Sequence, residues 1–143
     1  MIKVKGSILI NAPVEKVFAF MDDPCNLPEI WPSMIETRVK GPSPAGGQDF
    51  EWEYKMAGLR IKGESEVIER IPDRKVVTHS KKGIETTFVW SYEPEDGGTR
   101  LTVEAEYNIP IPLVGKLAEN VIVKQNEREA DILLENLKTR MEG

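Results

Sequence analysis

The stretch TTFVWSYEPEDGGTRLTVEAEY, residues 86–107, carries the clearest signal for the fold. Aromatic side chains occupy every second position of residues 88–92, and apolar or aromatic ones every second position of residues 101–107. Because successive side chains of a strand point to opposite faces, each run predicts a strand with one buried face. The turn residues Asp96-Gly97-Gly98 join the two runs, so we expect an antiparallel hairpin.

The same alternation continues upstream of this hairpin and predicts the rest of a sheet. Further strands are expected over residues 2–10, 35–39, 50–56, 59–67 and 75–80. Most of them are separated by short turn-like connections, which is typical of an antiparallel meander. With the hairpin, the sequence predicts seven strands, each with one wet and one dry face.

Two short helical segments are expected after the first strand. Pro13 is suited to the first turn of a helix, and apolar residues follow at helical spacing from Val14 to Met21. Asp22-Asp23-Pro24 ends this helix, and residues 28–31 predict one more short helical piece.

The last part of the chain, Leu113 to Glu142, is helical in composition, but its apolar stripe does not run straight. At about 100° per residue, the stripe that ends at Val121 is rotated by roughly 150° from the stripe that follows. We therefore expect a kink, or a junction of two helices, near Ile122–Lys124. Asn126 falls on the second apolar stripe, where a polar side chain needs a partner from protein, water or ligand.

Composition excludes several classes of protein. The 143 residues are 40% hydrophobic and 30% charged, with 19 basic and 24 acidic residues and a net charge of -5. This balance argues against a nucleic-acid partner and against attachment to an anionic membrane. No run approaches the roughly 20 apolar residues of a membrane helix, and the N-terminus does not read as a signal peptide. We expect one domain over residues 1–143, in the cytoplasm, where the single Cys25 forms no internal disulfide.

A sheet with one dry face must be covered, and the C-terminal helix is the only predicted element long enough. Taken together, ILINAPVEKVFAFMDDPCNLPEIWP (8–32), the stretch 86–112 and NEREADILLENLKTRME (126–142) resemble the START/Bet v 1-like superfamily. Within it, the chain is similar to the polyketide cyclase/dehydrase-like branch. The resemblance implies an α+β helix-grip fold of order β-α-α-β6-α, with a pocket between the curved sheet and the long helix. Members include lipid and sterol carriers, hormone receptors and aromatase/cyclases, which share no catalytic signature, so no catalytic residue is carried over.

Aromatic residues on the apolar strand faces either fill the core or line such a pocket. Trp31, between the first helix and the second strand, has the same two interpretations, since it could pack in the core or border the pocket entrance. We predict that the ligand-binding residues are Trp31, Trp52, Tyr54, Ile61, Thr86, Phe88, Trp90, Tyr107, Val121 and Asn126.

A metal or cofactor site has little support in the sequence. His79 is the only histidine and Cys25 the only cysteine, so we expect no metal site and no cofactor. Three functions stay open at this point. The first is binding or transport of a small hydrophobic molecule such as a lipid, isoprenoid or aromatic metabolite. The second is a cyclase or dehydratase that uses Tyr54, Tyr107, His79 or Glu129 as its acid or base. The third is a regulatory module that binds a protein partner and has an incidental cavity.

Overall fold

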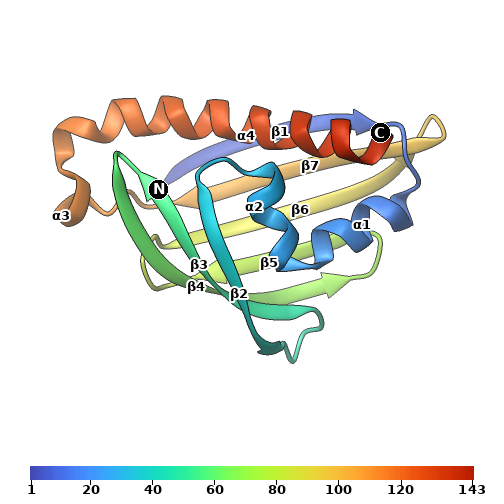
Figure 1. Ribbon diagram of the computed structural model, residues 1–143, viewed down its shortest axis with the longest axis horizontal. Helices are drawn as coiled ribbons and strands as arrows, with labels where there is room; N and C mark the ends of the chain where they lie inside the picture. The colour runs from blue at the N-terminus through green and yellow to red at the C-terminus, as the bar shows by residue number, and fades with distance from the viewer.

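The computed structural model describes residues 1–143, apart from the side chain of Leu113. Figure 1 shows a long sheet with one helix lying across it and two short helices at its side. The elements in chain order are β1 (Ile2–Ile10), α1 (Val14–Asp22), a 3-10 turn (Pro24–Asn26), α2 (Leu27–Ile30), β2 (Met34–Pro42), β3 (Gln48–Met56), β4 (Leu59–Ile71), β5 (Lys75–Ser80), β6 (Thr86–Glu95), β7 (Gly98–Tyr107), α3 (Ile111–Val114), a second 3-10 turn (Lys116–Ala118) and α4 (Glu119–Glu142).

The seven strands form one antiparallel sheet in the order β1-β7-β6-β5-β4-β3-β2. The predicted hairpin of β6 and β7 is confirmed, and residues 86–95 pair with residues 98–107 in continuous register. Asp96 and Gly97 in its turn have φ values of 50° and 78°, which suits a two-residue turn with left-handed central residues. The last strand, β7, pairs with the first strand, β1. The predicted α+β order of elements is therefore confirmed.

β4 runs past residue 67, where alternation predicts its end. A register shift between Val67 and Glu69 breaks the period of two, and the strand then continues to Ile71. Such a bulge bends a strand and re-aims the side chains after it. Ile68, within this shift, is exposed and follows the outward-facing positions of the alternation that ends at Val67.

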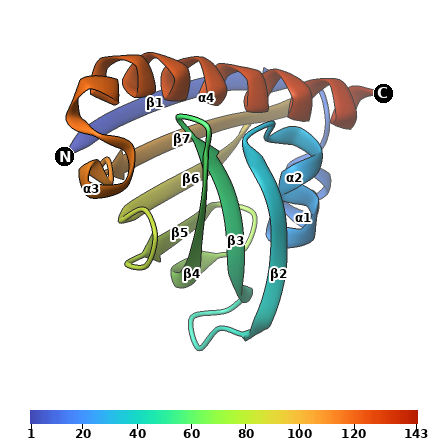
Figure 2. The same ribbon diagram turned by 60° about the vertical axis from the view of Figure 1, so that its left-hand side comes forward.

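The sheet curves around α4, which packs along β1 and above β7 and β6 (Figure 2). Leu133, Leu134 and Leu137 of α4 are buried in the core between helix and sheet. The helix comes close to β1 at Gly6, where a methyl group would lie 2.9 Å from Leu134 Cδ1. α1 and α2 close one side of the concave face.

The predicted kink near Ile122–Lys124 is wrong, because the break comes earlier. Gly115, at φ 83°, ends α3, and from Glu119 onward α4 runs without interruption. A single straight helix buries one stripe, and here that stripe starts at Ile122, so Val121 is 56% exposed and Leu117 fully exposed. None of the helices in the described part of the chain is both long and apolar enough to span a membrane.

Candidate ligand-binding site

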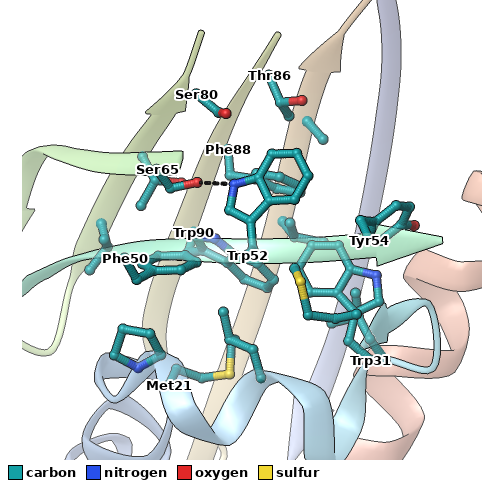
Figure 3. Close-up of a pocket in the computed structure, with 18 of the residues that line it drawn as sticks. Met21, Trp31, Phe50, Trp52, Tyr54, Ser65, Ser80, Thr86, Phe88 and Trp90 are labelled. Atoms are coloured by element: carbon teal, nitrogen blue, oxygen red, sulfur yellow. Dashed lines mark hydrogen bonds between the residues drawn. The ribbon is translucent and has the colours of Figure 1, made fainter. Parts of the chain in front are cut away.

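A cavity of about 140 Å³ lies between the concave face of the sheet, α4 and the pair α1 and α2. Inward-facing side chains of β3 to β7 supply most of its wall, and α4 supplies Asn126, Glu129, Ala130 and Leu133. Figure 3 shows the aromatic side chains that meet in this space. The wall is mainly apolar with a few polar groups, as in sites that bind small organic molecules.

Trp31 is the centre of the aromatic wall. Its ring meets Tyr54, Phe88 and Trp90 edge to face, with centroids 5.9, 5.4 and 6.4 Å away. Phe88 and Trp90 stack at 5.8 Å because alternate positions of β6 share one face. Edge-to-face and offset-stacked pairs are the preferred geometries of aromatic rings, so this part of the wall is well defined.

Trp52 crosses the cavity from β3, and its indole is held at two points. Its Nε1 donates a hydrogen bond to Ser65 Oγ at 3.0 Å, drawn in Figure 3. Its ring also covers Gly63, the residue opposite it on β4, where a methyl group would lie 2.2 Å from Trp52 Cζ2. The indole can lie flat on this strand only because residue 63 has no side chain.

At one end of the cavity, three polar side chains are joined by hydrogen bonds. Tyr54 OH donates to Asn126 Oδ1 at 3.3 Å, and Asn126 Nδ2 donates to Tyr107 OH at 2.9 Å. The hydrogen-bond partners that Asn126 needs on its apolar stripe are therefore side chains of the same protein. Because α4 is continuous, it places this amide one turn beyond Ile122 on the inward face.

Tyr54 and Tyr107, the two tyrosines hydrogen-bonded to Asn126, stay neutral at ordinary pH. Burial, with a smaller effect of the Glu129 carboxylate, raises the pKa of Tyr54 to about 12. Burial also raises the pKa of Tyr107. Glu129 itself accepts a hydrogen bond from the Ser33 backbone N–H at 2.6 Å.

The described lining residues include two carboxylates and no lysine, arginine or histidine. One carboxylate, Asp22, is bound by Arg70, whose Nη2 and Nε lie 2.8 and 3.0 Å from its two oxygens. The other is Glu129. Gln125, Arg128 and Lys55 line a neighbouring depression, which shares Glu129 with the cavity.

Eight of the ten predicted site residues are brought together in the cavity wall: Trp31, Trp52, Tyr54, Thr86, Phe88, Trp90, Tyr107 and Asn126. Ile61 is buried in the core outside that wall. Val121 is not in it either, because the helix break at Gly115 leaves this residue on the outer face of α4. The role of all ten residues in ligand binding stays a prediction.

Ser65 and Ser80 were not predicted, although both are buried and both lie in the cavity wall. Ser65 was visible as a small polar residue on the apolar side of the alternation in residues 59–67, next to Gly63. Small residues on an inward strand face indicate space or a close contact. That signal could have found this part of the site.

Residues with reactive side chains lie elsewhere. His79 is outside the cavity wall, and its Nδ1 is 2.8 Å from Thr87 Oγ1. Cys25 is exposed. Among the described side chains, no three of His, Cys, Asp or Glu gather as a metal ion requires.

Solved structures share this fold. The protein TTHA0849 from Thermus thermophilus matches with a TM-score of 0.84 at 22% identity, over 98% of this chain and 97% of that one. The Zhui aromatase/cyclase from a Streptomyces species matches with a TM-score of 0.79 at 15% identity, over 99% and 93%. A START superfamily protein from Mycobacterium smegmatis matches with a TM-score of 0.66 at 18% identity, over 91% and 96%. At these identities the matches establish the fold alone.

No functionally curated protein matches the sequence. The model of one protein family does, over residues 1–142, and its description is polyketide cyclase / dehydrase and lipid transport. The resemblance to the polyketide cyclase-like branch is thereby confirmed, and the match to a START superfamily protein is one of fold. The chain belongs to the polyketide cyclase/dehydrase and lipid transport family.

Proposed function

We propose that this protein binds a small, largely apolar molecule in the cavity between the sheet and α4. The observation that carries the proposal is the cavity wall itself, where aromatic rings surround a space that has polar groups at one end. Such a wall supplies apolar contact area, and the polar groups orient the ligand. The family description, which joins cyclases with lipid transport, supports the same class of function.

The size of the cavity favours a compact ligand. Its volume of about 140 Å³ is close to the roughly 150 Å³ of an engineered apolar cavity that binds benzene. A molecule with one or two fused rings matches this space better than a sterol or a long acyl chain. The edge-to-face rings around Trp31 also present surfaces that suit a planar guest.

A cyclase or dehydratase reaction is the second candidate. Tyr54 and Tyr107 are neutral O–H groups in the wall, and Glu129 brings a carboxylate to the same end of the cavity. An acid and a base held beside a bound substrate can together catalyse proton transfers. Mass spectrometry of bound compounds before and after incubation separates binding from turnover.

A thermal-shift screen tests the proposed function. The panel contains a fatty acid, an isoprenoid, a sterol, a flavonoid and a two-ring aromatic ketone. A ligand at 100 times its Kd stabilises the folded state by about 2.7 kcal/mol, which is several degrees for a domain of this size. We expect the flavonoid and the two-ring aromatic ketone to raise Tm most, and the sterol and the fatty acid to raise it less.

A matched pair of variants tests whether the rise in Tm comes from binding in the cavity. Ala130→Leu adds side-chain volume to the cavity wall, whereas Ala19→Leu adds it to an exposed position of α1. The shift should disappear in Ala130→Leu and persist in Ala19→Leu, with circular dichroism confirming that both are folded. A flat screen of folded, ligand-free protein, or a shift that survives in Ala130→Leu, would contradict the proposal.

A further inference from the structure

An open depression of about 410 Å³ lies next to the cavity, where α4 meets the turn that joins β3 to β4. Its described lining residues are Ser33, Lys55, Ala57, Gly58, Gln125, Arg128 and Glu129. Figure 2 shows the tip of the β3–β4 hairpin beneath α4, where these segments come together. Glu129 lines both the depression and the cavity, so the two spaces are neighbours at this side chain.

The depression contains two cations that no carboxylate of the described residues binds. Lys55 and Arg128 are both exposed, and neither takes part in any ion pair within the described part of the chain. Acidic residues outnumber basic ones by 24 to 19, so carboxylates for such pairs are plentiful elsewhere. A methyl group added at Gly58 would meet no atom within 4 Å beyond its chain neighbours, so the turn leaves this side of the depression accessible.

Glu129, which lines both spaces, does not neutralise the two cations. Its Oε1 instead accepts a hydrogen bond from the Ser33 backbone N–H at 2.6 Å. Two cations and one carboxylate leave the depression with one net positive charge among its described residues. The described cavity wall contains carboxylates and no cationic side chain. The two neighbouring spaces therefore suit different parts of one molecule, an apolar part in the cavity and an anionic part in the depression.

The side chains of the depression favour a carboxylate as this anionic part. The guanidinium of Arg128 is planar and offers paired N–H donors to a carboxylate, and Lys55 adds a compact positive charge. Gln125 brings an amide donor to the same depression. One net positive charge matches a singly charged carboxylate better than a doubly charged phosphate ester. An anion is costly to desolvate inside an apolar cavity, but in an open depression it keeps part of its water.

We propose that the depression binds the carboxylate of a compact aromatic acid whose ring system occupies the cavity. Lys55 and Arg128 contact the carboxylate, and a short linker passes beside Glu129 to the rings. This assignment rests on the proposed function and adds a second contact site and the ligand's chemical class to it.

Three acids with linkers of increasing length test this proposal by calorimetry: 2-naphthylacetate, 3-(2-naphthyl)propionate and 4-(2-naphthyl)butyrate. Each is compared with its primary amide, a neutral molecule of nearly the same shape, so the ratio of the two affinities cancels the contribution of the rings. At the linker length with the highest acid-to-amide ratio, we expect the double variant Lys55→Gln/Arg128→Gln to lower that ratio about 2- to 10-fold, the range for two exposed ion pairs. Its affinity for the amide should change less than about twofold.

Lys124→Gln is the matched control, because it removes an exposed cation from the same helix outside the depression. In this variant the acid-to-amide ratio should change less than about 1.5-fold, since solvent and salt screen a charge that does not contact the ligand. Lys55, Lys124 and Arg128 are all exposed, so the variants should stay folded. Raising NaCl from about 0.05 M to about 0.5 M should lower the ratio in the wild-type protein and leave it unchanged in the double variant.

A second readout observes both spaces at once in ¹H–¹⁵N spectra of the wild-type protein. Trp90 lines the cavity, and Arg128 lines the depression. The indole resonance of Trp90 should move with the acid and with the amide, because both place their rings in the cavity. The Nε–H resonance of Arg128 should move with the acid alone.

The outcomes separate this inference from the proposed function. If the amides bind and the acid-to-amide ratio is the same in wild type and the double variant at every linker length, the inference fails and the proposed function stands. If the acids move the Arg128 resonance and leave Trp90 unmoved, the depression binds anions independently of the cavity, which also overturns the inference. If neither acids nor amides bind, the inference fails, and the thermal-shift panel decides whether the proposed function fails with it.

Discussion

Asn126 illustrates what a single residue can reveal before a structure is known. Its position on an apolar helical stripe required a buried partner, and the structure supplies Tyr54 and Tyr107. The two partners could not be deduced, because they come from strands 72 and 19 residues away along the chain. Local periodicity places a side chain on a face, but the register between sheet and helix decides which atoms meet.

The tyrosines give the residue-scale prediction. The chain has three, and burial raises the pKa of Tyr54, Tyr92 and Tyr107 above the usual value of 10, for Tyr54 to about 12. The absorbance of tyrosinate should therefore rise at higher pH in the folded protein than in the unfolded chain. In guanidinium chloride the same groups should titrate near pH 10.

The direction of the pH effect on stability follows from proton counting. Above about pH 10 the unfolded chain loses tyrosine protons that the folded protein retains, so the free energy of unfolding falls as pH rises. For Tyr54 this contribution is fully present below the unfolded pKa of 10 and is lost as the pH rises to about 12. A folded protein whose tyrosines titrate normally near pH 10 would contradict the described burial.

At the scale of elements, strands were easier to predict than the helix. Alternation identified all seven strands. The predicted dry face is missing in β2, where Ile35 and Val39 are exposed and only Met34 is buried. Alternation failed at the end of β4, where a bulge breaks the period. The inward stripe from Ala130 to Met141 was predicted correctly. The kink and the inward position of Val121 were wrong, because the apolar residues before Gly115 and after it belong to separate helical segments. Composition alone does not show where a glycine adopts a positive φ.

Two neighbouring substitutions test the orientation of α4. Ile122 is 1% exposed and Val121 is 56% exposed, although both are branched apolar residues on one turn. Ile122→Ala should lower the free energy of unfolding by about 2–5 kcal/mol through a cavity and lost burial. Val121→Ala should change it by about 0.5 kcal/mol or less. Chemical denaturation measures both, and equal losses would contradict the register of the helix.

At the scale of the molecule, the fold and the family could be predicted from the sequence, while the cavity could be only partly foreseen. Seven half-buried strands and one long helix leave few ways to cover the dry face, so the architecture follows from pattern. A cavity is different, because it is volume that side chains fail to fill. Its extent depends on how Trp31 and Trp52 pack, and on Gly63 and Ser65, which give Trp52 its place.

The central claim is that this cavity is a binding site. The most direct test is a crystal structure of the protein grown with 2-acetylnaphthalene. We predict electron density for the ring system between β6 and α4, in contact with Trp31, Phe88 and Trp90. Density for the compound only on the outer surface, with a cavity wall unchanged from the free protein, would contradict the claim.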